Sequence, residues 1–246
     1  MKAWPALLLI AVAAACWVVT ANRMVGMDMG PGTDLGGIGW FAGVWVTMMA
    51  AMMLPSLVPM GLASARAPGT TALGWSRSTT AVVLFAVGYL LTWLAAGLVA
   101  YSLIQGVRSL DPGFLAWGEA GPYLAGGVIV GAALYELTAV KATCLRRCRD
   151  PQQLIERRRS GRLGMLQIGV EHGGYCVGCC WALMAALFAL GVMSIAWMAV
   201  ITAVIATEKL LPWAALAVGT TTVVLVALGI GVALAPSGVP GLTIPG

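Results

Sequence analysis

The sequence has little charge, and this shortage decides its class. Only 9% of its 246 residues are charged, whereas 60% are hydrophobic, and the mean hydropathy is +0.93. A typical soluble domain carries about 25% charged residues. Such a composition excludes an ordinary soluble domain and predicts a chain whose solvent is the lipid bilayer.

Histidine and acidic residues are also scarce. His172 is the only histidine, and nine Asp and Glu stand against 14 Lys and Arg, which gives a formal charge of +5. The basic run lacks the interleaved aromatic residues or motif of a nucleic-acid site, so nucleic acid is not an expected partner. Basic residues concentrated in one short stretch mark the cytoplasmic side of a membrane protein instead. Eight of the 14 lie in such a stretch: Lys141, Arg146, Arg147, Arg149, Arg157, Arg158, Arg159 and Arg162.

Apolar segments recur along the whole chain. We predict an all-α protein, a polytopic transmembrane helical bundle that forms one integral membrane domain over residues 1–246, with a basic cytoplasmic loop between the fourth and fifth spans. One helix from Tyr175 to Leu211 would be about 55 Å long, against roughly 30 Å of hydrocarbon, so a break is expected, and Gly191-Val192 is the candidate. The seven predicted spans are about 3–21, 39–62, 79–105, 118–140, 175–190, 193–210 and 212–235.

The positive-inside rule orients these spans. With residues 141–174 in the cytoplasm, the N-terminus and the loop that carries Arg66 and Arg77 are also cytoplasmic, while each external loop carries one arginine. The first segment has the n-region and h-region of a signal peptide, but its apolar run continues to Ala21. We therefore expect an uncleaved first helix with a cytoplasmic N-terminus.

Glycines predict where helices meet in the membrane. Gly127 and Gly131 have the GxxxG spacing in the fourth segment, and Gly88 and Gly97 interrupt the third. Small residues let helix backbones approach closely, either within one bundle or between two copies of the chain.

Five of the six cysteines form two clusters on either side of the basic stretch. Residues four apart share a face of a helix, so the thiols of each cluster can converge. Gathered thiolates select Cu(I), Zn or an iron–sulfur centre and can also exchange disulfides. We predict a metal site where the clusters meet, with His172 as a nitrogen ligand; small-residue packing or palmitoylation is the alternative. The clustered residues are Cys144, Cys148, Cys176, Cys179 and Cys180.

Methionines form a second group of soft ligands. Thioethers bind Cu(I) and few harder ions, although Met also serves as a filler of helix packing. Pro55 follows the main group and predicts a kink there. A smaller external group is Met27-Asp28-Met29. The main group lies in the second span, where residues four apart form two stripes: Met48 with Met52, and Met49 with Met53.

Ionisable residues inside spans are costly and therefore informative. Glu136 lies near the cytoplasmic end of the fourth segment, where Lys141 is close enough to pair with it. We regard Glu136 as a candidate metal ligand or proton acceptor. Glu208 and Lys209 close the sixth segment, where a structural ion pair or snorkelling to the interface would explain them.

Several motifs resemble one family of bacterial proteins. They are Met48-Met-Ala-Ala-Met-Met-Leu-Pro-Ser56, residues 135–151, Cys176-Val-Gly-Cys-Cys-Trp-Ala-Leu-Met184, residues 191–198 and Glu208-Lys209. Together they are similar to a family of uncharacterised, predicted metal-binding integral membrane proteins, over about residues 35–212. Ser194 departs from the pattern, which usually has Asn there. The resemblance implies a bacterial inner (plasma) membrane location and metal binding, and is silent on reaction and metal.

The leading hypothesis is a membrane protein that handles a soft metal, most simply Cu(I), with zinc as the alternative ion. It would take the ion at the Met-rich face and hold or pass it at the cytoplasmic thiols, with the bilayer, the ion, and a metallochaperone or second copy as partners. No catalytic residue is predicted, and no phosphate-binding loop is present. The rivals are a membrane thiol-disulfide oxidoreductase, which a reducing cytoplasmic position disfavours, and a structural subunit stapled by zinc.

Overall fold

The computed structural model describes residues 4–24, 35–58, 75–109, 120–150, 162–191 and 194–236, and within these ranges it contains helices and no strand. The predicted all-α class is confirmed. The helices are α1 (Trp4–Met24), α2 (Ile38–Met53), the 3₁₀ helix η1 (Leu54–Leu57), α4 (Trp75–Ser109), α5 (Gly121–Glu136), α6 (Ala139–Arg149), α8 (Arg162–Gly191), α9 (Ile195–Leu210) and α10 (Ala214–Leu234).

Five of these helical segments are long and apolar enough to cross a membrane. A sixth candidate is the pair α5 and α6, which meet at an angle of 66°. The helix α9 has only 16 residues. Each of the seven predicted segments contains a helix, so the predicted number of spans holds approximately.

Two helices have bounds that differ from those of the predicted spans. The fourth segment ends at Glu136 and is followed by the separate helix α6, while α8 begins at Arg162, well before the predicted start at residue 175. The stretch 141–174 is therefore helical at both ends, and residues 151–161 lie outside the described ranges. The first half of α8 was not predicted as part of the span because the exposed polar residues Gln167 and Glu171 interrupt its apolar pattern.

The predicted break after the fifth segment is present. Gly191 ends α8 with a φ of 104°, a left-handed conformation that glycine adopts without a steric penalty. Ser194 then caps α9, where its hydroxyl accepts a hydrogen bond from the amide of Trp197 at 3.5 Å. A capped start and a glycine stop divide what would otherwise be one overlong helix.

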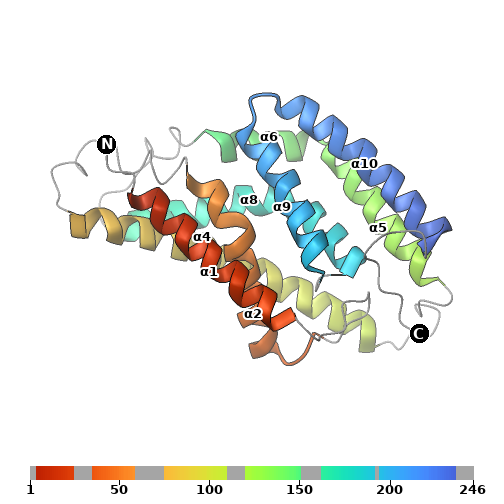
Figure 1. Ribbon diagram of the computed structural model, residues 1–246, viewed down its shortest axis with the longest axis horizontal. Helices are drawn as coiled ribbons and strands as arrows, with labels where there is room; N and C mark the ends of the chain where they lie inside the picture. The colour runs from red at the N-terminus through yellow and green to blue at the C-terminus, as the bar shows by residue number, and fades with distance from the viewer. Residues whose placement is uncertain are drawn as a thin grey trace.

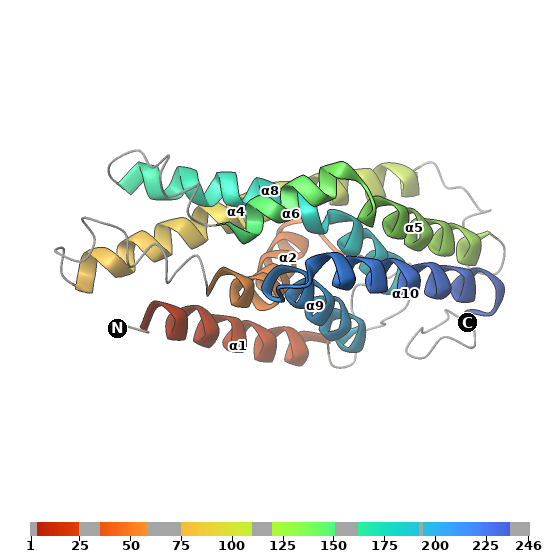
Figure 2. The ribbon, with the colours of Figure 1, turned by 90° about the horizontal axis from the view of Figure 1, so that it is seen from above.

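The helices pack as pairs along the molecule (Figures 1 and 2). The helices α4 and α8 run side by side, and Gly88 and Gly169 bring their backbones into contact, since an added Cβ at either would overlap the other helix's backbone. The helices α5 and α10 pair through Gly126 and Gly229. Among the described residues nothing lies within 4 Å of a Cβ built on Gly127 or Gly131, so the predicted GxxxG face makes no close contact with that part of the chain.

The second half of α2 is surrounded by other helices. Trp45 lies over Gly97 of α4 and donates its Nε1–H to the carbonyl of Trp93 at 2.7 Å. Beyond it, every residue from Met48 to Leu54 is buried. The α-helix ends at Met53, beside Pro55, and the hydroxyl of Ser56 satisfies the carbonyl of Met53 at 2.7 Å. The predicted distortion at Pro55 is thus a change from α to 3₁₀ geometry.

Candidate metal centre

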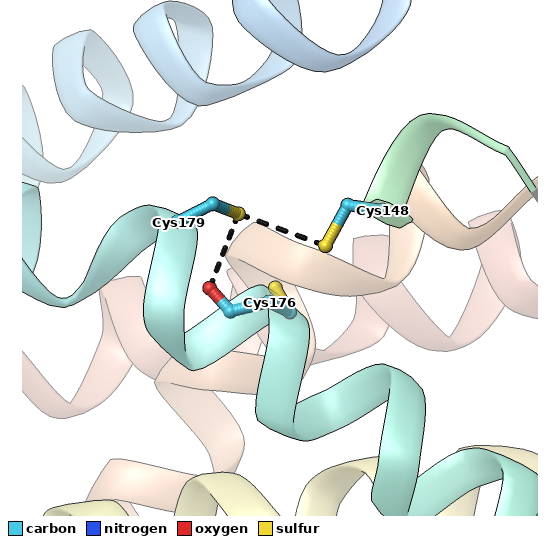
Figure 3. A group of neighbouring side chains, drawn as sticks. All are labelled: Cys148, Cys176 and Cys179. Atoms are coloured by element: carbon cyan, nitrogen blue, oxygen red, sulfur yellow. Dashed lines mark hydrogen bonds between the residues drawn. The ribbon is translucent and has the colours of Figure 1, made fainter. Parts of the chain in front are cut away.

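Three cysteine sulfurs meet where the end of α6 crosses the middle of α8. The Sγ atoms of Cys148, Cys176 and Cys179 all lie within 4.8 Å of one another. Cys148 belongs to α6, and the other two belong to successive turns of α8 (Figure 3). Across the two helices, the sulfurs of Cys179 and Cys148 lie 3.7 Å apart. The two predicted cysteine clusters therefore contribute to one group of thiols.

The position of Cys148 follows from the turn between α5 and α6. Thr138 caps α6, its hydroxyl accepting from the amide of Lys141 and donating to the carbonyl of Tyr135 at 2.7 Å. The Tyr135 hydroxyl then donates to the carbonyl of Gly178 at 2.6 Å, which ties this turn to α8. At the other end of α6, Arg147 donates to the Tyr175 hydroxyl at 2.9 Å and lies 5.2 Å from its ring centroid. Both ends of α6 are thereby held on α8.

The remaining clustered cysteines lie beside the group of three. The sulfur of Cys180 is 3.3 Å from that of Cys179. Cys144 packs on Gly178, where a Cβ would come within 2.6 Å of its sulfur. It faces α8, but it is outside the group of three sulfurs.

Cys176 has two polar partners that were not predicted. The hydroxyl of Tyr89 on α4 lies 2.8 Å from its sulfur, and the Nζ of Lys209 on α9 donates to it at 2.9 Å. Lys209 and Cys176 are both buried. An ammonium in a water-poor site offsets the charge of a thiolate, which would otherwise be costly there. The sequence marked Lys209 only as a charge at the end of a span, and nothing in it singled out Tyr89.

His172 lies one turn before Cys176 on α8 and is 3% exposed. Its ring is 5.7 Å from that of Phe85 and 5.9 Å from that of Tyr89, centroid to centroid. Its Nδ1 has no hydrogen-bond partner among the described residues. His172 is thus a buried nitrogen donor close along the helix to the thiols, although it is outside the group of three sulfurs.

The methionine helix ends next to the thiols. Met48, Met49, Met52 and Met53 are each at most 2% exposed. Ser56, three residues beyond the last of them, lies 3.5 Å from the Nζ of Lys209, the same ammonium that contacts Cys176. The end of the methionine helix and the thiol group therefore share Lys209 as a neighbour. The second methionine group, Met27-Asp28-Met29, lies outside the described residues.

Glu136 lies in an ion-paired group of buried side chains. Its carboxylate forms an ion pair with Lys141, as the sequence predicted, and Lys141 also pairs with Glu208 at 2.7 Å. All three side chains are at most 2% exposed. The structure thus brings Glu136 to an ammonium and a second carboxylate, while the thiols gather around Lys209.

The described donors suit a soft metal ion. Three thiols from two helices, with a fourth thiol beside them, offer the ligand type that selects Cu(I), Zn or iron–sulfur centres, and all six cysteines are free. Close thiols can also exchange a disulfide.

The comparisons with known proteins bear on this choice. The family described as PpoB2, copper chaperone, matches residues 42–232, a range that includes α6, α8, α9 and all four methionines of α2. No curated protein and no solved structure matches the chain.

Proposed function

The chain belongs to the PpoB2 copper chaperone family, and on this premise we propose that it is a membrane protein that binds Cu(I) at Cys148, Cys176 and Cys179 and passes it on. The observation that carries the proposal is the convergence of these three sulfurs from α6 and α8. Thiolates prefer Cu(I) to harder ions, and zinc is the alternative that the same ligands accept. Cys144, Cys180 and His172 lie around this group and offer further donor atoms to the ion.

The buried methionines support a path for the ion. In this proposal Cu(I) enters from the external side, moves along the four thioethers of α2 and arrives beside Lys209 at the thiols. Thiolate is the stronger ligand, so the ion moves down a gradient of affinity without an energy source in this chain. Five helices have the length and apolar composition to cross a bilayer, and the arginines of α6 support a cytoplasmic position for the thiols.

Lys209 offsets part of the negative charge of the proposed site. Three thiolates and one Cu(I) carry two net negative charges, and the ammonium 2.9 Å from Cys176 balances one of them. The ion would leave to a partner with thiols of its own, either a metallochaperone or a second copy of the chain. This is the role of a carrier rather than of an enzyme.

Metal analysis of the full chain in detergent tests this function. After loading with Cu(I) and removal of excess ion, we expect about one copper per chain, held by thiolates. Inductively coupled plasma mass spectrometry counts the metal, and X-ray absorption reports its sulfur ligands. Purified protein with inert zinc would indicate a structural staple, whereas a reversible disulfide without metal would indicate an oxidoreductase. Either result overturns the copper proposal.

The methionine path makes a separate prediction. Replacing both Met48 and Met52 with Leu conserves volume but removes two thioethers, so Cu(I) should still bind at equilibrium but load more slowly, by about tenfold. Stopped-flow loading of protein in vesicles measures the rate. The matched control replaces Met184 and Met198, which are also buried, with Leu. Equal loading rates for both double variants would make the methionines of α2 packing residues only.

A further inference from the structure

A second buried polar group lies where α5, α6 and α9 meet. Lys141 of α6 pairs with Glu136 at the end of α5 and with Glu208 in the last turn of α9. The Oε1 atoms of both glutamates are buried and have no hydrogen-bond partner among the described residues. The proposed copper path uses none of these three side chains.

The charges in this group do not balance. Two carboxylates face one ammonium, which leaves one negative charge in a site whose side chains are at most 2% exposed. Arg149 does not correct this, because its guanidinium donates to the backbone carbonyls of Glu208 and Leu211 rather than to a carboxylate. An unbalanced buried charge is expensive in a membrane protein, and the carboxyl pair can accept one proton that would remove it.

The other charged and titratable groups on the neighbouring elements have partners of their own. Lys209 of α9 contacts Cys176. Tyr135 of α5 donates to Gly178 of α8, and on α6 Arg147 and Arg146 bind Tyr175 and Thr143 respectively. On α5, α6 and α9 the two glutamates are therefore the described proton acceptors that remain incompletely satisfied, while on α8 the Nδ1 of His172 is another.

We propose that the Glu136 and Glu208 carboxyl pair takes up a proton when Cu(I) binds at the thiols. This inference rests on the proposed function. Each thiol that binds the ion loses its proton, so an S–H bond breaks and an S–Cu bond forms. One of these protons forms an O–H bond on one glutamate, and the others pass to the solvent. Copper stays Cu(I), so no electron moves. Three thiols can release up to about three protons against the single charge of the ion, which makes the site more negative and favours protonation of a nearby carboxylate.

The two groups are mechanically joined. Glu208 and Lys209 are consecutive residues of α9, and one contacts Lys141 while the other contacts Cys176. Lys141 and Cys148 lie on the same short helix, α6. A change of charge at the thiols therefore acts on the carboxyl pair through two shared helices at short range.

Infrared difference spectroscopy on the full chain in detergent tests the proposal. Cu(I) loading of the wild type should produce the C=O stretch of a protonated carboxyl group, with the small downshift in D₂O that identifies it. In weak buffer with a pH indicator, the wild type should release about one proton fewer per bound Cu(I) than Glu136→Gln, which keeps one carboxylate for one ammonium. Glu208→Gln should behave like Glu136→Gln and serves where that variant folds poorly.

Glu171→Gln is the matched control, because Glu171 is an exposed carboxylate on α8, and it should match the wild type in both measurements. Bound copper is counted in the same samples. Normal copper binding without the carboxyl band, or with equal proton release in wild type and Glu136→Gln, overturns the inference and leaves the proposed function standing. Absence of copper binding in the wild type overturns both.

Discussion

Cys176→Ser combined with Cys179→Ser is expected to abolish stoichiometric Cu(I) binding. The two residues supply two of the three converging sulfurs, so Cys148 is the only member of that group left to bind the ion. Loss of an outer-shell partner already costs about 10- to 100-fold in metal affinity, so the loss of two direct ligands should exceed the upper end of that range. Competition with a Cu(I) chelator and metal analysis measure the effect.

Two single variants serve as controls for that result. Cys16→Ser changes a cysteine on α1, outside the thiol group, and should leave binding unchanged. Cys144→Ser distinguishes the sequence prediction, in which Cys144 is a metal ligand, from the structure. In the structure its sulfur packs on Gly178 and lies outside the group of three. We expect Cys144→Ser to retain copper. Retained copper in the Cys176 and Cys179 double variant would place the metal elsewhere.

Lys141→Met is expected to cause the largest loss of stability. It leaves the carboxylates of Glu136 and Glu208 buried without their shared ammonium, and removal of one partner from a buried ion pair costs about 3–5 kcal/mol. The free energy of unfolding, measured by denaturant titration in detergent, should fall by that amount.

The matched control is Arg146→Met, a change of an exposed cation on the same helix, which should shift stability by no more than about 0.5 kcal/mol. The triple variant, in which Lys141, Glu136 and Glu208 are all replaced with Met, should regain much of the free energy of unfolding that Lys141→Met loses. Apolar side chains of similar volume replace a buried ionic group at little cost. A loss no larger than that of Arg146→Met would show that Lys141 is not essential to the packing of α5, α6 and α9.

Most of the correct predictions about the site came from the number of residues that separate two side chains on the same helix or across a short turn. Cys176 and Cys179 converge because they lie one turn apart on α8, and Glu136 reaches Lys141 across the short turn between α5 and α6. The length of the apolar run required a break, although it did not fix the place of that break at Gly191. Spacing failed in the first half of α8, where a buried stripe faces α4 while Gln167 and Glu171 remain exposed, so this part of the helix is not a continuous apolar run.

Composition and periodicity by themselves determined that this chain is a helical protein with membrane-length apolar segments, and that soft ligands gather in a few places along it. The tertiary structure decided which of them meet. It brings Cys148 rather than Cys144 to the thiols of α8, and it adds Lys209 and Tyr89, which are distant in sequence. Local periodicity orients a side chain about its own helix axis. The rotation and height of one helix against another depend on contacts such as those of Gly88 and Gly169, which join segments far apart in the chain.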